Sequence, residues 1–176
     1  MNLKIINFTD NKGIINKKYL CKKNGGSNIM PSIKWNSVNG AENYVIIMED
    51  LDANNGKCNF MHLYIKSCNK TINQIDKLNF GNIELFKNKM NEKINKKING
   101  RLIFGKNHTG TYGYYGPCNP HNYNHNYLFT IYALNNSYKS DLSDTICGSK
   151  EFEHKYKNNI LTKDSKEFNY VKTRNK

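Results

Sequence analysis

The sequence predicts a β-rich sandwich with one late helix, and three observations lead to this fold class. Apolar residues fall in short runs, turn signals such as Asn24-Gly25-Gly26 and Asn39-Gly40 separate these runs, and one segment near the end combines a capping residue with helical spacing. The 176 residues contain no internal repeat and no domain linker, so we expect a single domain. Many short strands with one helix are typical of a sandwich.

The first third of the chain supplies the early strands. Residues 1–28 carry short apolar runs that fit two or three strands. Residues 31–35 alternate, which places Ile33 and Trp35 on one face. Residues 44–48 form a continuous apolar run, which predicts a strand that is covered on both faces and ends abruptly at the acidic residues that follow.

The next strand is predicted from strict alternation over residues 60–65. Three of these residues share one face and the other three share the opposite face. The first set is Phe60, His62 and Tyr64, and the second set is Met61, Leu63 and Ile65. We therefore expect His62 on a sheet face between two aromatic rings.

The end of the chain predicts the helix and one further element. Ser149 is a candidate cap for a helix over residues 149–157, which would place Phe152 and Tyr156 on one face. Residues 160–171 fit either an edge strand or a continuation of the helix.

The charge of the chain is strongly positive. Lys and Arg number 27 against 14 acidic residues, for a net charge of +13, which favours polyanionic partners in general. Arg occurs only at Arg101 and Arg174, whereas base reading and bidentate phosphate contacts favour Arg. We therefore expect no specific nucleic-acid binding, and a basic surface open to peripheral contact with an anionic membrane. Residues 71–99 are rich in Asn and Lys and predict an exposed basic insertion.

The cysteines bear on the compartment. Five of them, an odd number with no CxxC pair, argue against a disulfide framework and for a reducing compartment. The N-terminus has no apolar run of signal-peptide length, and no transmembrane segment is visible. The sequence predicts a cytoplasmic protein.

A stiff loop over residues 112–126 is the strongest candidate for a binding site. Its glycines allow backbone angles closed to other residues, and its prolines fix φ and lack a backbone donor. It leads into residues 127–134, which are aromatic and β-branched enough to form a buried strand. A rigid loop that carries Tyr, Cys and His on a core strand is a favourable place for ligand binding.

Metal and nucleophile chemistry are alternatives at this loop. Cys118, His121 and His125 have C-x2-H-x3-H spacing, but a zinc site needs a fourth ligand, which Cys58 or His108 would have to supply. A Cys118–His125 nucleophile pair is a further alternative that requires hydrogen-bond contact. We expect no metal, no cofactor and no catalytic residue.

A second candidate feature is the acidic pair Asp50 and Asp52, which flank Leu51 just after a buried strand. This segment is either a polar turn or a pair of carboxylates that orient imidazoles, accept ligand donors or hold a metal.

Four segments together resemble the phosphatidylethanolamine-binding protein family, which includes the Raf kinase inhibitor proteins and bacterial and archaeal relatives. These segments are PSIKW, EDLDA, FMHLYI and YYGPCNP followed by HNYLFTIYAL. The resemblance implies a two-sheet antiparallel β-sandwich with a short C-terminal helix. It departs at Leu51 and Asn54, where the family has prolines, at Asn119, which replaces another proline, and at Tyr115, which replaces a glycine. Asn126 stands in place of an arginine, so Asp52 needs another partner or a raised pKa.

The resemblance implies non-enzymatic binding of a phosphate-bearing ligand, such as a phosphatidylethanolamine head group or a phosphoamino acid, and regulation of a protein kinase. The residues it places in the pocket are Asp50, Asp52, Ala53, His62, Tyr115, Gly116, Pro117, His125 and Tyr127. A phosphate beside carboxylates requires that His62 and His125 are protonated or donate N–H, and that backbone N–H groups near Gly116 face its oxygens. We then expect carboxylates to raise the imidazole pKa values, and affinity to rise as pH falls from about 7.5 to 5.5. The alternative is a hydrolase that uses the same Asp and His groups as acid and base.

Overall fold

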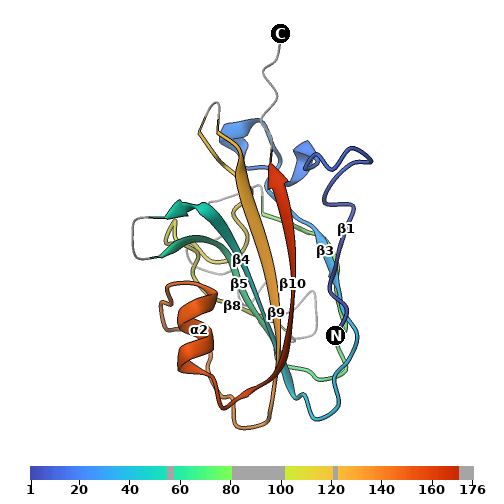
Figure 1. The fold of residues 1–176 in the computed structure, drawn as a ribbon, viewed down its shortest axis with the longest axis vertical. Coiled ribbons are helices and arrows are strands. Elements are labelled where there is room, and N and C mark those ends of the chain that lie inside the picture. Colours follow the sequence, from blue (N-terminus) through green and yellow to red (C-terminus); the bar gives the residue numbers. More distant parts are fainter. Residues whose placement is uncertain (55–57, 81–101, 121–122, 171–176) are drawn as a thin grey trace.

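A five-stranded antiparallel sheet is the centre of the computed structural model, which describes residues 1–54, 58–80, 102–120 and 123–170 (Figure 1). Its strands lie in the order β10-β9-β4-β5-β8. They span Asn43–Asn54 (β4), Asn59–Ser67 (β5), Leu102–Phe104 (β8), His125–Leu134 (β9) and Ile160–Tyr170 (β10). Of the two structures that the sequence allowed for the end of the chain, an edge strand or a continued helix, residues 160–170 form the edge strand, which pairs with β9.

A second layer of short strands covers one face of this sheet. It has a three-stranded part, β1-β3-β6, and a two-stranded part, β2-β7. The strands are Lys4–Ile6 (β1), Ile29–Met30 (β2), Ser32–Lys34 (β3), Gln74–Ile75 (β6) and Leu78–Asn79 (β7). Two 3-10 helices, Lys17–Tyr19 (η1) and Lys22–Asn24 (η2), precede β2. The helix Ser149–Lys155 (α2) lies on the other side from β1 and β3 (Figure 1). The predicted mainly β sandwich with a late helix is confirmed.

Strand β4 separates two hydrophobic cores, which explains its continuous apolar run. Tyr44, Ile46 and Met48 pack into the core under the second layer, whereas Val45 and Ile47 pack into the core under α2. The prediction of a strand covered on both faces is therefore confirmed. The predicted end is wrong, because β4 continues to Asn54 and the acidic residues lie within its last part.

The predicted alternation in β5 is wrong because the strand contains a β-bulge at His62. Met48 pairs with Leu63 and Glu49 pairs with Met61, which leaves His62 as an extra residue between them. Tyr64 therefore faces α2 together with Met61, instead of sharing a face with His62. Hydrophobicity could not reveal the bulge, since every residue from Met61 to Ser67 is buried.

The helix begins differently from the prediction. Gly148 is the N-cap, with φ 89°, and the Ser149 hydroxyl donates instead to the buried carboxylate of Glu49. Ser149 therefore attaches the helix to β4 and does not cap it. Phe152 is fully buried, and Tyr156 packs beside it as expected.

Two disulfides contradict the expectation from the cysteine count. Cys21 is bonded to Cys118 and Cys58 to Cys147, while Cys68 is free and exposed. The partners lie 97 and 89 residues apart in sequence, so only the fold brings them together. An odd count with no CxxC pair therefore did not exclude disulfides.

The predicted basic insertion falls largely on residues that the structure does not describe. Its first part forms β6 and β7, which belong to the second layer. Residues 81–99 of the prediction lie outside the described residues. In the part of the chain that is described, no helix is long and apolar enough to cross a membrane.

Candidate functional site

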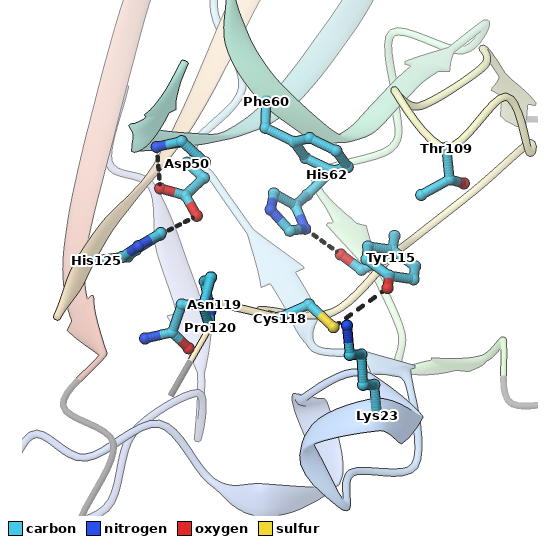
Figure 2. Close-up of a pocket in the computed structure, with 11 residues that line it drawn as sticks. Lys23, Asp50, Phe60, His62, Thr109, Tyr115, Cys118, Asn119, Pro120 and His125 are labelled. Carbon is cyan, nitrogen blue, oxygen red and sulfur yellow. Dashed lines mark hydrogen bonds and ion pairs between the residues drawn. The ribbon is translucent and has the colours of Figure 1, made fainter. Parts of the chain in front are cut away.

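A cavity of about 260 Å³ lies where the ends of β4, β5 and β9 meet the loop over residues 115–120 and the helix η2 (Figure 2). Its lining residues are Lys23, Asp50, Ala53, Phe60, His62, Thr109, Tyr115, Cys118, Asn119, Pro120 and His125. Five of the nine predicted site residues line it, namely Asp50, Ala53, His62, Tyr115 and His125. The sequence thus identified the three strands and the loop that form the site.

Asp50 and His125 form a buried pair on neighbouring strands. The distance from His125 Nδ1 to Asp50 Oδ2 is 2.6 Å, and Asp50 pairs in register with Tyr127, two residues after His125. Asp50 Oδ1 accepts the backbone N–H groups of Asp52 and Ala53, each at 3.0 Å. Asp50 therefore holds both its own strand end and the His125 ring, and His125 Nε2 is the ring atom left to face a ligand.

His62 is neutral near pH 7. Its Nδ1 lies 2.6 Å from the Tyr115 carbonyl oxygen, which can only accept, so Nδ1 carries the hydrogen. Burial lowers the pKa of His62 to about 4, against an opposing effect of this hydrogen bond and of Asp50. Nε2 is then a hydrogen-bond acceptor, and Figure 2 shows it on the side of the ring that faces Asp50 and His125. The expectation that a carboxylate raises the pKa of His62 is wrong, because desolvation outweighs the effect of Asp50.

Aromatic rings pack against His62. Phe60 is one of them, as predicted, but the other is Tyr127 instead of the predicted Tyr64. The ring centroids of Phe60 and Tyr127 lie 4.8 Å and 5.3 Å from that of His62. Tyr127 is fully buried behind both imidazoles and does not line the cavity. Burial and the nearby charge of Asp50 raise the pKa of Tyr127, so its hydroxyl stays protonated. Tyr127 therefore packs against the two imidazole rings and does not contact a ligand in the cavity.

Two backbone N–H groups near Gly116, those of Tyr115 and Gly116 itself, do not face the cavity as predicted. The Gly116 N–H donates to Asn28 Oδ1 at 2.6 Å, and the Tyr115 N–H donates to the His62 carbonyl at 2.9 Å. These donors are therefore committed inside the protein. A Cβ at Gly116 would lie 2.2 Å from the Tyr19 carbonyl oxygen, so the position needs glycine for close approach of two backbones.

Pro117 and Asp52 also lie outside the cavity lining. The Pro117 carbonyl accepts the Cys21 N–H at 3.1 Å, which ties the loop to η2. Asp52 is exposed and accepts the backbone N–H of Asn126 at 2.6 Å. Asp52 therefore has a hydrogen-bond partner in the backbone of Asn126, although no cation among the described residues takes the place of the arginine side chain there.

The zinc alternative finds no support in the part of the chain that is described. Cys118 and Cys58 are both in disulfides, and His108 Nδ1 accepts the Met61 N–H at 3.0 Å. Among the described residues, no group of three or more His, Cys, Asp and Glu side chains is placed to hold a metal. His121 lies outside them. The disulfide also occupies the Cys118 sulfur, which the nucleophile alternative requires.

Sequence reasoning missed Lys23, which reaches the cavity from η2 (Figure 2). It also missed Thr109, whose hydroxyl donates to Asn107 Oδ1. Lys23 belongs to no motif and lies 27 residues before Asp50 in the chain. Lys23 follows Cys21 by two residues. This proximity could have indicated that Lys23 is near the loop only if the Cys21–Cys118 disulfide had been known.

The fold and the site define a β-sandwich protein with an Asp/His pocket, and comparisons with known proteins identify its family. The model of the phosphatidylethanolamine-binding protein family matches residues 5–171. The UPF0098 protein of Methanothermobacter thermautotrophicus is 32% identical over 139 residues, which cover 76% of each chain. The chain belongs to the phosphatidylethanolamine-binding protein family.

Two solved structures share the fold. Escherichia coli YbcL, described as a member of the mammalian PEBP family, has a TM-score of 0.73 at 17% identity and covers 97% of this chain and 98% of its own. A phosphatidylethanolamine-binding protein homologue from Chlamydia trachomatis has a TM-score of 0.68 at 20% identity, with 97% of each chain covered. The predicted family and fold are confirmed.

Proposed function

We propose that the protein binds a small phosphate-bearing ligand in the cavity beside Asp50, without catalysing its conversion. One observation carries the proposal: the Asp50–His125 pair, the neutral His62 and the cationic Lys23 surround a single cavity of about 260 Å³. This volume suits a small polar head group. Membership of the family supports the same reading.

The ligand contacts follow from the donors and acceptors that the side chains leave open. Phosphate binding at this position requires a hydrogen on His125 Nε2 as well as on Nδ1, because Nδ1 donates to Asp50. In that form Nε2 donates to a phosphate oxygen and Asp50 neutralises the imidazolium. His62 Nε2 accepts a hydrogen bond, either from a protonated phosphate oxygen or from the ammonium of phosphoethanolamine. Repulsion from Asp50 is limited because its two oxygens already accept three hydrogen bonds.

The state of the possible nucleophiles weighs against a hydrolase that forms a covalent intermediate at Cys118 or Thr109; the acid–base hydrolase is left to the experiment below. The Cys118 sulfur is in a disulfide, and the Thr109 hydroxyl donates to Asn107.

Regulation of a protein kinase and peripheral contact with an anionic membrane stay predictions. A cytoplasmic location also stays a prediction, and the two disulfides weigh against it because disulfides persist mainly in oxidising compartments.

Calorimetric titration with phosphoethanolamine tests the proposal. His125→Ala is expected to weaken binding at least tenfold, roughly the loss of one charge-assisted hydrogen bond of ~1.5 kcal/mol or more. His125→Gln serves as a second variant, and His154→Ala, at an exposed position on α2, is the matched control with unchanged affinity.

Two outcomes would count against binding without catalysis in this pocket. Equal affinities for wild type, His125→Ala and His154→Ala would refute the assigned pocket. Release of inorganic phosphate that depends on His125, followed by phosphorus NMR, would instead support the hydrolase.

A further inference from the structure

We propose that Lys23 makes the pocket selective for phosphate monoesters over phosphate diesters, and that the Cys21–Cys118 disulfide positions it. This inference rests on the proposed function and names the ligand class of the same site. A monoester carries up to two negative charges near pH 7.5 and a diester carries one, so a nearby fixed cation discriminates between them.

Lys23 is the cation of the pocket. Of the described residues that line the cavity, Lys23 alone is a lysine or arginine. Among the described residues it takes part in no ion pair; the lysines that do are Lys70, Lys155 and Lys163. Figure 2 shows its side chain extending from η2 towards the pocket residues Cys118 and Tyr115. Its charge is therefore free to act on a ligand.

Three attachments hold η2 against the pocket loop. The disulfide joins Cys21 to Cys118, and the Cys21 N–H donates to the Pro117 carbonyl at 3.1 Å. On the other side of Lys23, the Asn24 side-chain amide donates to the Asn119 carbonyl at 3.1 Å. Lys23 is exposed, as Lys22 is, but it lies between two anchored neighbours, which limits the positions its backbone can take.

The neutral His62 adds to the same selectivity. Its Nε2 can accept a hydrogen bond from a phosphate O–H, which a singly protonated monoester has and a diester anion lacks. Both protonation states of a monoester therefore have a favourable contact in this pocket, the dianion with Lys23 and the monoanion with His62. A diester shares the contact with His125 but has neither the second charge for Lys23 nor a phosphate O–H for His62.

The test compares phosphoethanolamine with glycerophosphoethanolamine, since both carry the same ammonium and differ in phosphate charge. Calorimetric titrations at pH 7.5 and low salt use wild type, Lys23→Gln and Lys22→Gln. Lys22 lies on the same 3-10 helix, is exposed and does not line the cavity, so Lys22→Gln removes an equal charge as the matched control.

We expect Lys23→Gln to weaken phosphoethanolamine binding about tenfold and glycerophosphoethanolamine binding no more than about threefold. Lys22→Gln should change either affinity less than about twofold. Equal losses for both ligands, or equal effects of the two lysine variants, would overturn the role of Lys23 while leaving the proposed function intact. A wild type that binds neither ligand would overturn the proposed function itself.

A double-mutant cycle tests the positioning role of the disulfide. Replacing Cys21 and Cys118 by Ser should weaken monoester binding in wild type and change it little in Lys23→Gln, because both changes act through one side chain. Additive losses would contradict the positioning role. Thermal unfolding of each variant checks that the loss arises in a folded protein.

Discussion

Replacing Asp50 by Ala is expected to lower the free energy of unfolding by about 3–5 kcal/mol and to abolish phosphoethanolamine binding. Asp50 is 2% exposed and accepts three hydrogen bonds, from His125 and from the backbone N–H groups of Asp52 and Ala53. Removing the carboxylate leaves these donors without their acceptor, and the His125 ring loses the group that orients it. The cost is therefore that of a broken buried pair rather than that of one hydrogen bond.

Urea unfolding followed by the fluorescence of Trp35 measures the effect. Asp52→Ala is the comparison, because Asp52 is the same residue type two positions along, is exposed and accepts the N–H of Asn126. We expect it to cost about 1 kcal/mol. Asp50→Asn keeps an acceptor for the backbone and should fall between the two in stability while still losing ligand affinity. Similar costs for Asp50→Ala and Asp52→Ala would show that the buried pair does not hold the site.

The second large effect is a loss of stability in mild acid that depends on His62. Burial lowers its pKa to about 4 from the ordinary 6.5, so between these values the unfolded chain binds a proton that the folded protein does not. Falling pH therefore favours unfolding across this range. Linkage gives a loss of about 2 kcal/mol between pH 7 and pH 5 and about 1 kcal/mol more by pH 4, below which this group adds little.

Unfolding free energies of wild type and His62→Gln, measured at half-unit steps from pH 7.5 to 4.5, isolate this contribution. The glutamine does not titrate, and its side-chain amide is a donor for the Tyr115 carbonyl that His62 Nδ1 now contacts. The gap between the two curves should change by about 2.5 kcal/mol over the range, with wild type losing more. Parallel curves would mean that His62 has an ordinary pKa and is open to protonation.

The parts of the fold that could be predicted are those in which one physical signal dominates. The apolar run of β4 predicted a strand buried on both sides, and the order of motifs along the chain predicted which strands meet at the site. Asp50, His62 and His125 were identified because each sits in one of those motifs and each reaches the same cavity.

The missed features depend on information that a linear pattern does not contain. The β-bulge at His62 inserts one residue into a run that is buried on both faces, so no change in hydrophobicity marks it. The low pKa of His62 follows from its burial and not from its neighbours in sequence. Lys23 and the disulfide from Cys21 to Cys118 come together only through contacts between segments 97 residues apart.

A crystal structure of the protein soaked with phosphoethanolamine would show whether the cavity beside Asp50 is the binding site. We expect the ligand in this cavity, with the phosphate within hydrogen-bond distance of His125 Nε2 and of the Lys23 ammonium. Phosphoethanolamine bound elsewhere on the molecule, with this cavity holding only water, would contradict this expectation.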